Sequence, residues 1–237
     1  KNSDIESTNI ALRGSGDGLL ILEDSDFISQ GKVMTFSGLD TEITDSNAEL
    51  SQGDGPAVNV LEGQHQWNNF NVEKAYSSSD VTSQGIDAWY TSIESTSLTT
   101  NGYSTGAVFE DSALTAETAT FINGKTTGLY GIQSTFTLED LITSTQQYGV
   151  RLADESHLQT STWAANLHNT PLLLEEDSTA NARTFTPQNT AQGSSDAVGD
   201  GIFLYGGPTT STISTTATNA DADAASTRSC GAEKERS

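Results

Sequence analysis

The stretch TGLYGIQSTFTLEDLITSTQQ, residues 127–147, decides the fold of this chain. Its apolar residues come in twos and threes, separated by Ser, Thr, Gln and Gly. It contains neither the apolar stripe of an amphipathic helix nor an Asn-Gly hairpin turn. Apolar runs this short cannot form a hydrophobic core on their own. The stretch can bury them only if similar stretches of the chain stack against it.

Such copies occur at a period of 22 residues. The clearest markers, each 22 residues after the one before, are Ser112, Ser134, Ser156 and Ser178. Three apolar columns share this register: Val108, Tyr130, Leu152 and Leu174; Leu114, Phe136, Leu158 and Ala180; and Ala119, Leu141, Trp163 and Phe185. Looser copies begin at Gly18, Gly31, Gly55, Gly85 and Gly201. Self-similarity at a fixed period is the signature of a repeat architecture.

We therefore predict an all-β fold, a parallel β-solenoid of about nine coils with about 22 residues in each coil. Each short run would pair in parallel with the same run one coil later, about 4.8 Å away. The coil is expected over residues 16–207. Residues 1–15 are expected to cap its start, and residues 208–237 to form a polar tail.

Two other folds compete with the solenoid. A pair of helices would need a 3.6-residue period with caps inside each unit, whereas the units alternate and are rich in β-branched residues. A β-sandwich of antiparallel strands is the main rival. It gives no reason for an identical spacing over four consecutive units.

The four units from Gly106 to Gly193, and the looser units from Gly18 to Gly85, resemble those of right-handed parallel β-helix proteins of the pectate-lyase-like superfold. They are most similar to its extracellular forms, such as autotransporter passengers, surface adhesins and viral tail spikes. The resemblance implies a right-handed coil located outside the cell or on a cell or virion surface. It is weak for function, because this superfold hosts lyases, hydrolases, adhesins and purely structural parts.

The charge of the chain excludes several partners. With 32 acidic and 10 basic residues the net charge is −22, the wrong sign for contacts with the phosphates of nucleic acid or with an anionic membrane. The sequence contains no stretch of 18 apolar residues, so membrane insertion is not predicted. Cys230 is the only cysteine of the sequence, so an internal disulfide framework is excluded.

Aromatic residues suggest a glycan site. The long unit around GQHQWNNFNVEKAY and the unit that follows it contain Trp67, Phe70, Tyr76, Trp89 and Tyr90. If exposed on loops, these rings would offer stacking faces beside Asn, Gln and His, as a neutral sugar requires. The alternative is that Trp67 and Phe70 pack inward as strand residues.

Acidic residues follow the first apolar run of three units. They are Glu110, Asp111, Asp154, Glu155, Glu176 and Asp177. In the 22-residue register they form two columns, an acidic ledge that would suit Ca²⁺ or, as a carboxylate pair, glycoside hydrolysis. The alternative is a solvated corner. No other cofactor is predicted. The histidines His65, His157 and His168 share no column and are expected at the polar surface.

The sequence thus predicts a non-enzymatic extracellular protein, an adhesin, appendage subunit or virion fibre with an acidic surface rich in Ser and Thr. The alternative is a carbohydrate-active or glycan-binding β-helix. The predicted partners are a glycan or cell-surface partner, or other copies of the chain in a trimer or filament.

Overall fold

The computed structural model describes residues 3–53, 55–75, 83–166, 168, 170–188, 202–205 and 210–213. Within these ranges the regular elements are all β-strands, and no helix occurs. The strands are β1 (Ser3–Ser7), β2 (Ile10–Ser15), β3 (Leu19–Glu23), β4 (Ser25–Ser29), β5 (Lys32–Ser37), β6 (Asp40–Leu50), β7 (Val58–Lys74), β8 (Gln84–Asn101), β9 (Thr105–Glu110), β10 (Ala113–Ile122), β11 (Thr127–Ile132), β12 (Thr135–Ser144), β13 (Tyr148–Ala153), β14 (His157–Asn166), β15 (Thr170–Glu175), β16 (Thr179–Gln188), β17 (Ile202–Tyr205) and β18 (Thr210–Ile213).

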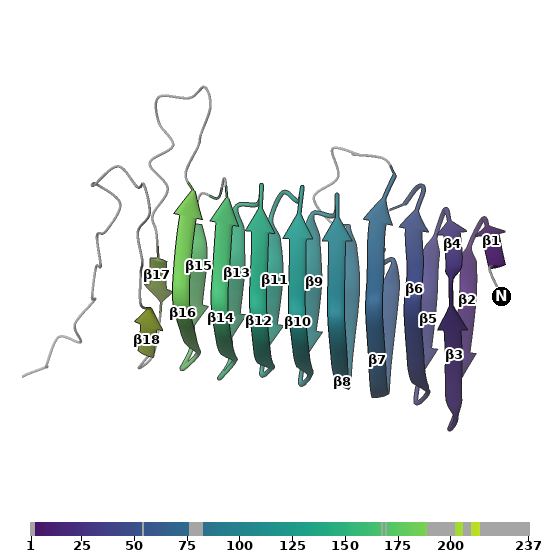
Figure 1. The fold of residues 1–237 in the computed structure, drawn as a ribbon, viewed down its shortest axis with the longest axis horizontal. Helices are drawn as coiled ribbons and strands as arrows, with labels where there is room; N and C mark the ends of the chain where they lie inside the picture. The colour runs from purple at the N-terminus through teal and green to yellow at the C-terminus, as the bar shows by residue number, and fades with distance from the viewer. Residues whose placement is uncertain are drawn as a thin grey trace, which may run out of the picture.

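The chain winds into a parallel β-solenoid, as predicted. It has about eight turns of about 22 residues each, where about nine turns were expected. Figure 1 shows the turns side by side, with β10, β12, β14 and β16 in the front layer and β9, β11, β13 and β15 behind them. Each strand pairs in parallel with its equivalent in the neighbouring turns, for example β12 with β10 and β14.

A turn has three sides, and the long strand supplies two of them. In β12 the buried residues are Phe136 and Leu138, and then Leu141 and Thr143. The two-residue alternation therefore changes phase at residues 139–140, where the strand bends. The short strand β11 forms the third side.

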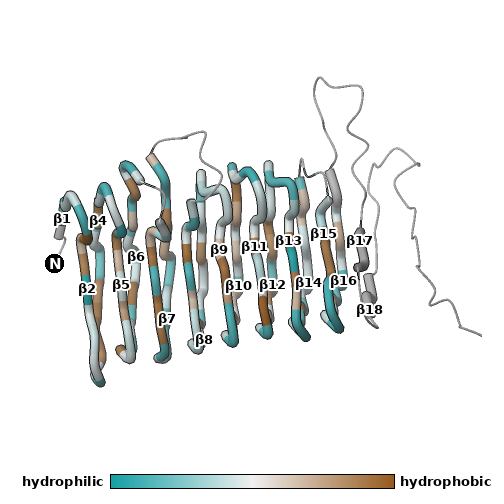
Figure 2. Tube along the Cα trace, turned by 180° about the vertical axis from the view of Figure 1, so that it is seen from behind, coloured by the Kyte–Doolittle hydropathy of each residue, from teal (hydrophilic) through white to brown (hydrophobic). Residues whose placement is uncertain are grey.

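The core is a stack of inward-facing columns. The predicted column from Leu114 to Ala180 and the one from Ala119 to Phe185 are both confirmed, because each member pairs with the next in the strand register. In Figure 2 brown apolar segments alternate with teal segments along the turns. Edge-to-face packing of Phe109 on Phe136, with ring centroids 5.4 Å apart, joins the short side to the long one.

The remaining predicted column, Val108, Tyr130, Leu152 and Leu174, is wrong by one residue. Tyr130 pairs with Val108 as expected, but its partner in the next turn is Arg151, and Leu152 pairs with Gly131. The reason lies in the corners. The corner before β13 has one residue fewer than the corresponding corner before β11, and the corner after β13 has one residue more. These two changes cancel, so the 22-residue serine register survives while β13 is shifted.

The serines that mark the period lie buried at the corner between the short and the long strand. There the backbone N–H of each serine donates to the side-chain oxygen of the serine one turn later, from Ser112 to Ser134, from Ser134 to Ser156 and from Ser156 to Ser178. Ser25 and Ser46 repeat the arrangement in the first turns. We call this run of contacts the serine ladder.

Two of the three histidines lie in the core, which corrects the expectation of a polar surface role. His65 shares the hydroxyl of Thr41 with the Trp67 indole N–H, at 2.9 Å from each. His168 and Trp163 share Thr143 in the same way. Desolvation by burial lowers the pKa of His65 to about 4, and it also lowers the pKa of His168. His157 is exposed, as expected.

The structure describes most of the expected cap and a part of the expected tail. Strands β1 and β2, within the expected cap, pair in parallel with β4 and β5. Strand β18, inside the expected tail, pairs in parallel with β16. The rest of residues 208–237, including Cys230, lies outside the described residues.

The part of the chain that the structure describes contains no helix long and apolar enough to cross a membrane.

Candidate ligand-binding groove

The bend in the long strands creates a groove on the outside of the coil. At the bend of β10, Thr115 and Glu117 both project outward, and Ala116 between them faces the core. The register repeats this arrangement one turn later with Thr137, Leu138 and Glu139. Because the bend is the same in each turn, the outward residues stack into two parallel rows that run along the coil.

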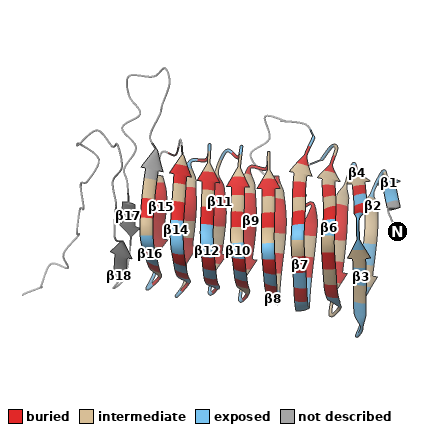
Figure 3. Ribbon diagram, in the orientation of Figure 1, coloured by how far each residue is buried: buried red, intermediate tan, exposed pale blue. Residues whose placement is uncertain are grey.

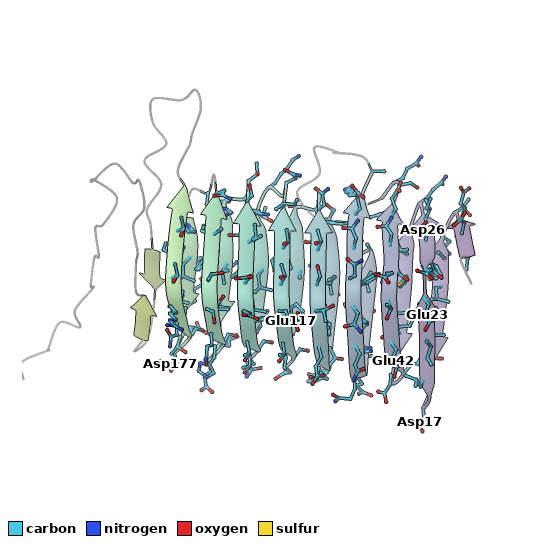
Figure 4. All side chains as sticks on the ribbon, in the orientation of Figure 1. Asp17, Glu23, Asp26, Glu42, Glu117 and Asp177 are labelled. Atoms are coloured by element: carbon cyan, nitrogen blue, oxygen red, sulfur yellow. The ribbon has the colours of Figure 1, made fainter. Side chains whose placement is uncertain are left out.

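The groove crosses six successive long strands, from β7 to β16, and has a volume of about 1070 Å³. Its first row, in which each residue pairs with the next, is Gln66, Glu94, Thr115, Thr137, Gln159 and Asn181. The second row is Asn68, Thr96, Glu117, Glu139, Ser161 and Arg183. Exposed segments interrupt the buried parts of β10, β12 and β14 in Figure 3. Figure 4 places Glu117 on the outward face of the front layer.

The floor of the groove is formed by small or apolar residues. Ala116, Leu138, Thr160 and Ala182 lie between the two rows and are buried. Most of the row residues are uncharged amides and hydroxyls, which both donate and accept hydrogen bonds. The charged exceptions in the rows are Glu94, Glu117, Glu139 and Arg183. The groove therefore combines hydrogen-bonding walls with a shallow floor and a modest negative charge.

The aromatic residues predicted to bind a ligand do not form one site. Trp67 and Phe70 are 0% and 1% exposed, packed edge to face with their ring centroids 5.1 Å apart, so their proposed stacking role is wrong and the inward alternative holds. Successive side chains of a strand point to opposite faces, and Trp67 and Phe70 occupy positions of β7 that face the core. This is why neither ring is available to a ligand. Tyr76 lies outside the described residues.

Trp89 and Tyr90 are at the surface but away from the groove. Trp89 lies on the outer face of the short side, where its indole N–H donates to the Asp87 carboxylate at 2.7 Å. Tyr90 is 56% exposed at the serine-ladder corner, over a shallow depression next to Gln64 and Asp111. These two rings remain candidates for contact with a partner, separate from the groove.

The acidic ledge is a backbone feature of this same corner. Five of its six members have a positive φ: Asp111, Asp154, Glu155, Glu176 and Asp177. The chain reverses direction there in the left-handed region, which Asp and Asn adopt more readily than most residues. Figure 4 shows Asp177 at the lower edge of the coil. Tyr90 and Gln133 occupy the equivalent corner position of other turns, also with positive φ.

The predicted columns of the ledge do not hold as drawn. Glu110 pairs with Ile132, which pairs with Ala153, so Asp154 stands outside the column of Glu110. Within the ledge, Glu176 approaches Asp154, and a hydrogen bond between these two carboxyl groups raises the pKa of Glu176. Among the described residues no group of three or more His, Cys, Asp or Glu is arranged to hold a metal ion. A role of the ledge in calcium binding stays a prediction.

Sequence reasoning missed the groove although its signal was present. Thr115, Thr137, Gln159 and Asn181 are 22 residues apart, as are Glu117, Glu139, Ser161 and Arg183. The same period that defines the apolar columns also relates the polar positions on either side of Ala116, and it predicts both rows on the outer surface.

Comparisons of the chain with protein-family models, with curated proteins and with solved structures found no match. Its assignment as a parallel β-solenoid therefore rests on the strand pairing itself.

Proposed function

We propose that this chain is a non-enzymatic extracellular β-solenoid that acts as an adhesive or structural module on a cell or virion surface. The observation that carries the proposal is the groove, which crosses six turns of a stiff, continuous parallel coil. A rigid scaffold with recurring hydrogen-bonding groups along one side suits attachment to a long or repetitive partner. The partner class is a glycan or another cell-surface polymer.

Composition supports a location outside the cell. The net charge of −22 and the abundance of Ser and Thr keep an elongated coil soluble and disfavour contact with nucleic acid and with anionic lipid. The resemblance to extracellular β-helix proteins of the pectate-lyase-like superfold points to the same location, and membership of that superfold is part of the proposal. Fold resemblance alone leaves the activity open, so the function has to be argued from the groove.

The proposal is tested by presenting the purified chain to a panel of immobilised neutral and acidic polysaccharides and to intact cells. Retention on at least one surface is expected, without release of reducing ends or of unsaturated sugars. Failure to bind any polysaccharide or cell surface would contradict an adhesive role.

A carbohydrate-active protein is the second candidate, and one observation favours it. Glu117 and Glu139 occupy equivalent positions in adjacent turns on the same wall of the groove. Strands in adjacent turns are about 4.8 Å apart, close to the separation of about 5 Å between the two carboxyl groups of retaining glycosidases. Release of reducing ends that disappears in both Glu117→Gln and Glu139→Gln would establish this candidate and overturn the non-enzymatic proposal.

A further inference from the structure

We propose that Asn123 is a site of spontaneous covalent modification, at which the side-chain amide is lost and the residue becomes isoaspartate or aspartate. The same dipeptide one turn earlier, Asn101-Gly102, is protected by the fold. The site lies outside the groove and requires no ligand. It arises because two identical dipeptides meet the same corner of the coil in different phases.

An Asn-Gly dipeptide contains both groups that react. The backbone nitrogen of the glycine attacks the side-chain Cγ of the asparagine, so an N–Cγ bond forms and the Cγ–Nδ2 bond breaks. The amide nitrogen leaves as ammonia with the proton of the glycine N–H, and a succinimide ring remains. Water then opens the ring at either carbonyl, which gives aspartate or isoaspartate. Glycine favours ring closure because it has no side chain and a permissive backbone.

The sequence contains this dipeptide twice, 22 residues apart, as Asn101-Gly102 and Asn123-Gly124. The strands do not follow that spacing here, because Asn101 of β8 pairs with Ile122 of β10, 21 residues further on. The two dipeptides are therefore one residue out of phase with the coil. Asn101 is the last residue of β8, whereas Asn123 follows the end of β10, and both lie at the arrow tips of these strands in Figure 1.

This phase decides whether the attacking nitrogen is free. The left-handed corner position is occupied by Gly102 in one turn, with a φ of 85°, and by Asn123 in the next, with a φ of 57°. The backbone N–H at this position donates to the following turn, from Gly102 to the oxygen of Ile122 at 3.0 Å and from Asn123 to that of Ser144 at 3.1 Å. Gly124 comes one residue later, and its N–H has no hydrogen-bond partner in the described part of the chain. The fold therefore engages the nitrogen of Gly102 and leaves that of Gly124 available.

The two asparagine side chains are also held to different degrees. The Asn101 amide accepts a hydrogen bond from Asn123 Nδ2 at 2.8 Å and donates one to the Glu73 carboxylate at 3.3 Å. Among the described residues the side chain of Asn123 makes only the first of these contacts, and Asn123 is exposed where Asn101 is half-buried. Ring closure requires the side chain to rotate. Because fewer hydrogen bonds break when Asn123 rotates, the opening costs less free energy there.

The product should destabilise this corner. An aspartate or isoaspartate at position 123 has no side-chain N–H, so the Asn101 oxygen loses its donor and faces a carboxylate instead. The new negative charge lies near Glu73 in a chain whose net charge is already −22, and it increases the self-repulsion of the folded state. Isoaspartate also lengthens the backbone by one methylene group at a corner of defined geometry.

The experiment is incubation of the purified full chain at mildly alkaline pH, which favours deprotonation of the attacking nitrogen. Mass spectrometry of the digested chain then quantifies isoaspartate and aspartate at both asparagines. Modification should be about tenfold faster or more at Asn123 than at Asn101, because local opening limits the reaction. The matched control is the same chain unfolded in guanidinium chloride, where the two dipeptides should react at similar rates. Asn123→Gln should suppress the product at this position.

Equal rates at the two asparagines of the folded chain, or a faster reaction at Asn101, would overturn the assignment. So would modification of both dipeptides in guanidinium chloride and of neither in the folded chain. The effect on the corner is tested separately by the thermal unfolding midpoint. Asn123→Asp should unfold at a lower temperature than the parent and than Asn123→Gly, which removes the same donor without adding charge. An Asn123→Asp variant as stable as the parent would contradict the predicted destabilisation.

Discussion

The backbone N–H of Ser134 donates a hydrogen bond of 3.0 Å to the side-chain oxygen of Ser156, one turn further along the coil. The hydroxyl of Ser134 donates to the carbonyl oxygen of Ile132 at 2.8 Å and accepts the backbone N–H of Ser112 at 3.1 Å. The side chain thus takes the place of a strand carbonyl at the corner. A buried N–H without an acceptor raises the free energy of the folded state. Because each serine side chain accepts the N–H of the preceding turn, the corner can recur in successive turns without such a cost.

Replacement of Ser134 by alanine should therefore destabilise the coil. The N–H of Ser112 loses its acceptor in a buried corner, which costs about 1–3 kcal/mol. Urea unfolding followed by circular dichroism measures the loss. Ser161→Ala, an exposed serine of β14, should change the free energy of unfolding by less than about 0.5 kcal/mol. Equal stability of Ser134→Ala and the parent would show that the ladder does not stabilise the corner.

A glycine stack gives the second prediction. A Cβ added to Gly128 would lie 2.6 Å from the backbone oxygen of Gly149, and one added to Gly106 would lie 2.5 Å from the oxygen of Gly128. The backbones of adjacent turns therefore approach too closely here for a side chain. Gly128→Ala should lower the free energy of unfolding by about 1–3 kcal/mol, as overpacking does.

The matched control is Gly55→Ala, because a Cβ there meets only the side chain of Lys32, at 3.9 Å. Its unfolding midpoint should stay close to that of the parent. If Gly128→Ala were as stable as Gly55→Ala, the close approach of the turns would be wrong.

The buried histidine His65 predicts a pH dependence of stability. Its pKa is about 4 in the folded protein, whereas a solvated histidine has a pKa of 6.5, so the unfolded chain binds more protons between these two values. The stabilising contribution is complete above pH 6.5 and falls as the pH drops toward 4. At about 1.36 kcal/mol per pKa unit, the full change amounts to about 3 kcal/mol. His168 acts in the same direction.

The measurement is the free energy of unfolding at several pH values between about 4 and 7 for the parent and for His65→Gln. The variant should show a shallower fall on acidification, because the group that protonates on unfolding is gone. His157→Gln replaces an exposed histidine and is the control. Parallel curves for the parent and His65→Gln would contradict the buried neutral state of His65.

The exposed apolar residues of β3, near the start of the coil, predict self-association into filaments or small oligomers. Leu19 and Ile21 of β3 are 56% and 55% exposed, and β3 pairs with β6 alone among the described strands. Exposed apolar side chains on an unpaired strand edge favour pairing with another chain. Light scattering should show a mass that increases with protein concentration.

The double variant Leu19→Lys and Ile21→Lys should return the mass to that of a single chain. Leu61→Lys removes a leucine that is 37% exposed in the middle of the coil, and it should leave the association unchanged. A parent chain that stays monomeric at every concentration would rule out this edge as an interface.

The fold could be predicted from the sequence because stacking requires like residues at like positions. The serine period located the turns, and columns such as Leu114 to Ala180 gave the direction of the core. The shift of β13 could not be predicted. One corner residue is missing before Tyr148 and one is added after Ala153, and the serine spacing hides both changes.

The candidate site was harder to predict for a physical reason. Aromatic and acidic residues are the usual candidates for ligand binding and catalysis. Here Trp67 is buried in the core, and Asp111 and Asp154 adopt the left-handed backbone conformation of a corner. The groove depends on the bend of the long strand near Glu117, where the alternation changes phase. A sequence pattern shows that phase change only when the inward and outward positions of several turns are aligned.

The most direct test of the account is disulfide formation between outward positions one turn apart. In a Cys230→Ser background, Thr115→Cys with Thr137→Cys places two thiols on directly paired residues of β10 and β12, within the Cα separation of about 4.4–6.8 Å that a disulfide needs. Thr115→Cys with Gln159→Cys, two turns apart, is the control. An intramolecular disulfide is expected in the first pair and none in the second. A first pair that stays reduced under oxidising conditions, or equal cross-linking of the two pairs, would contradict the 22-residue parallel coil and the groove built on it.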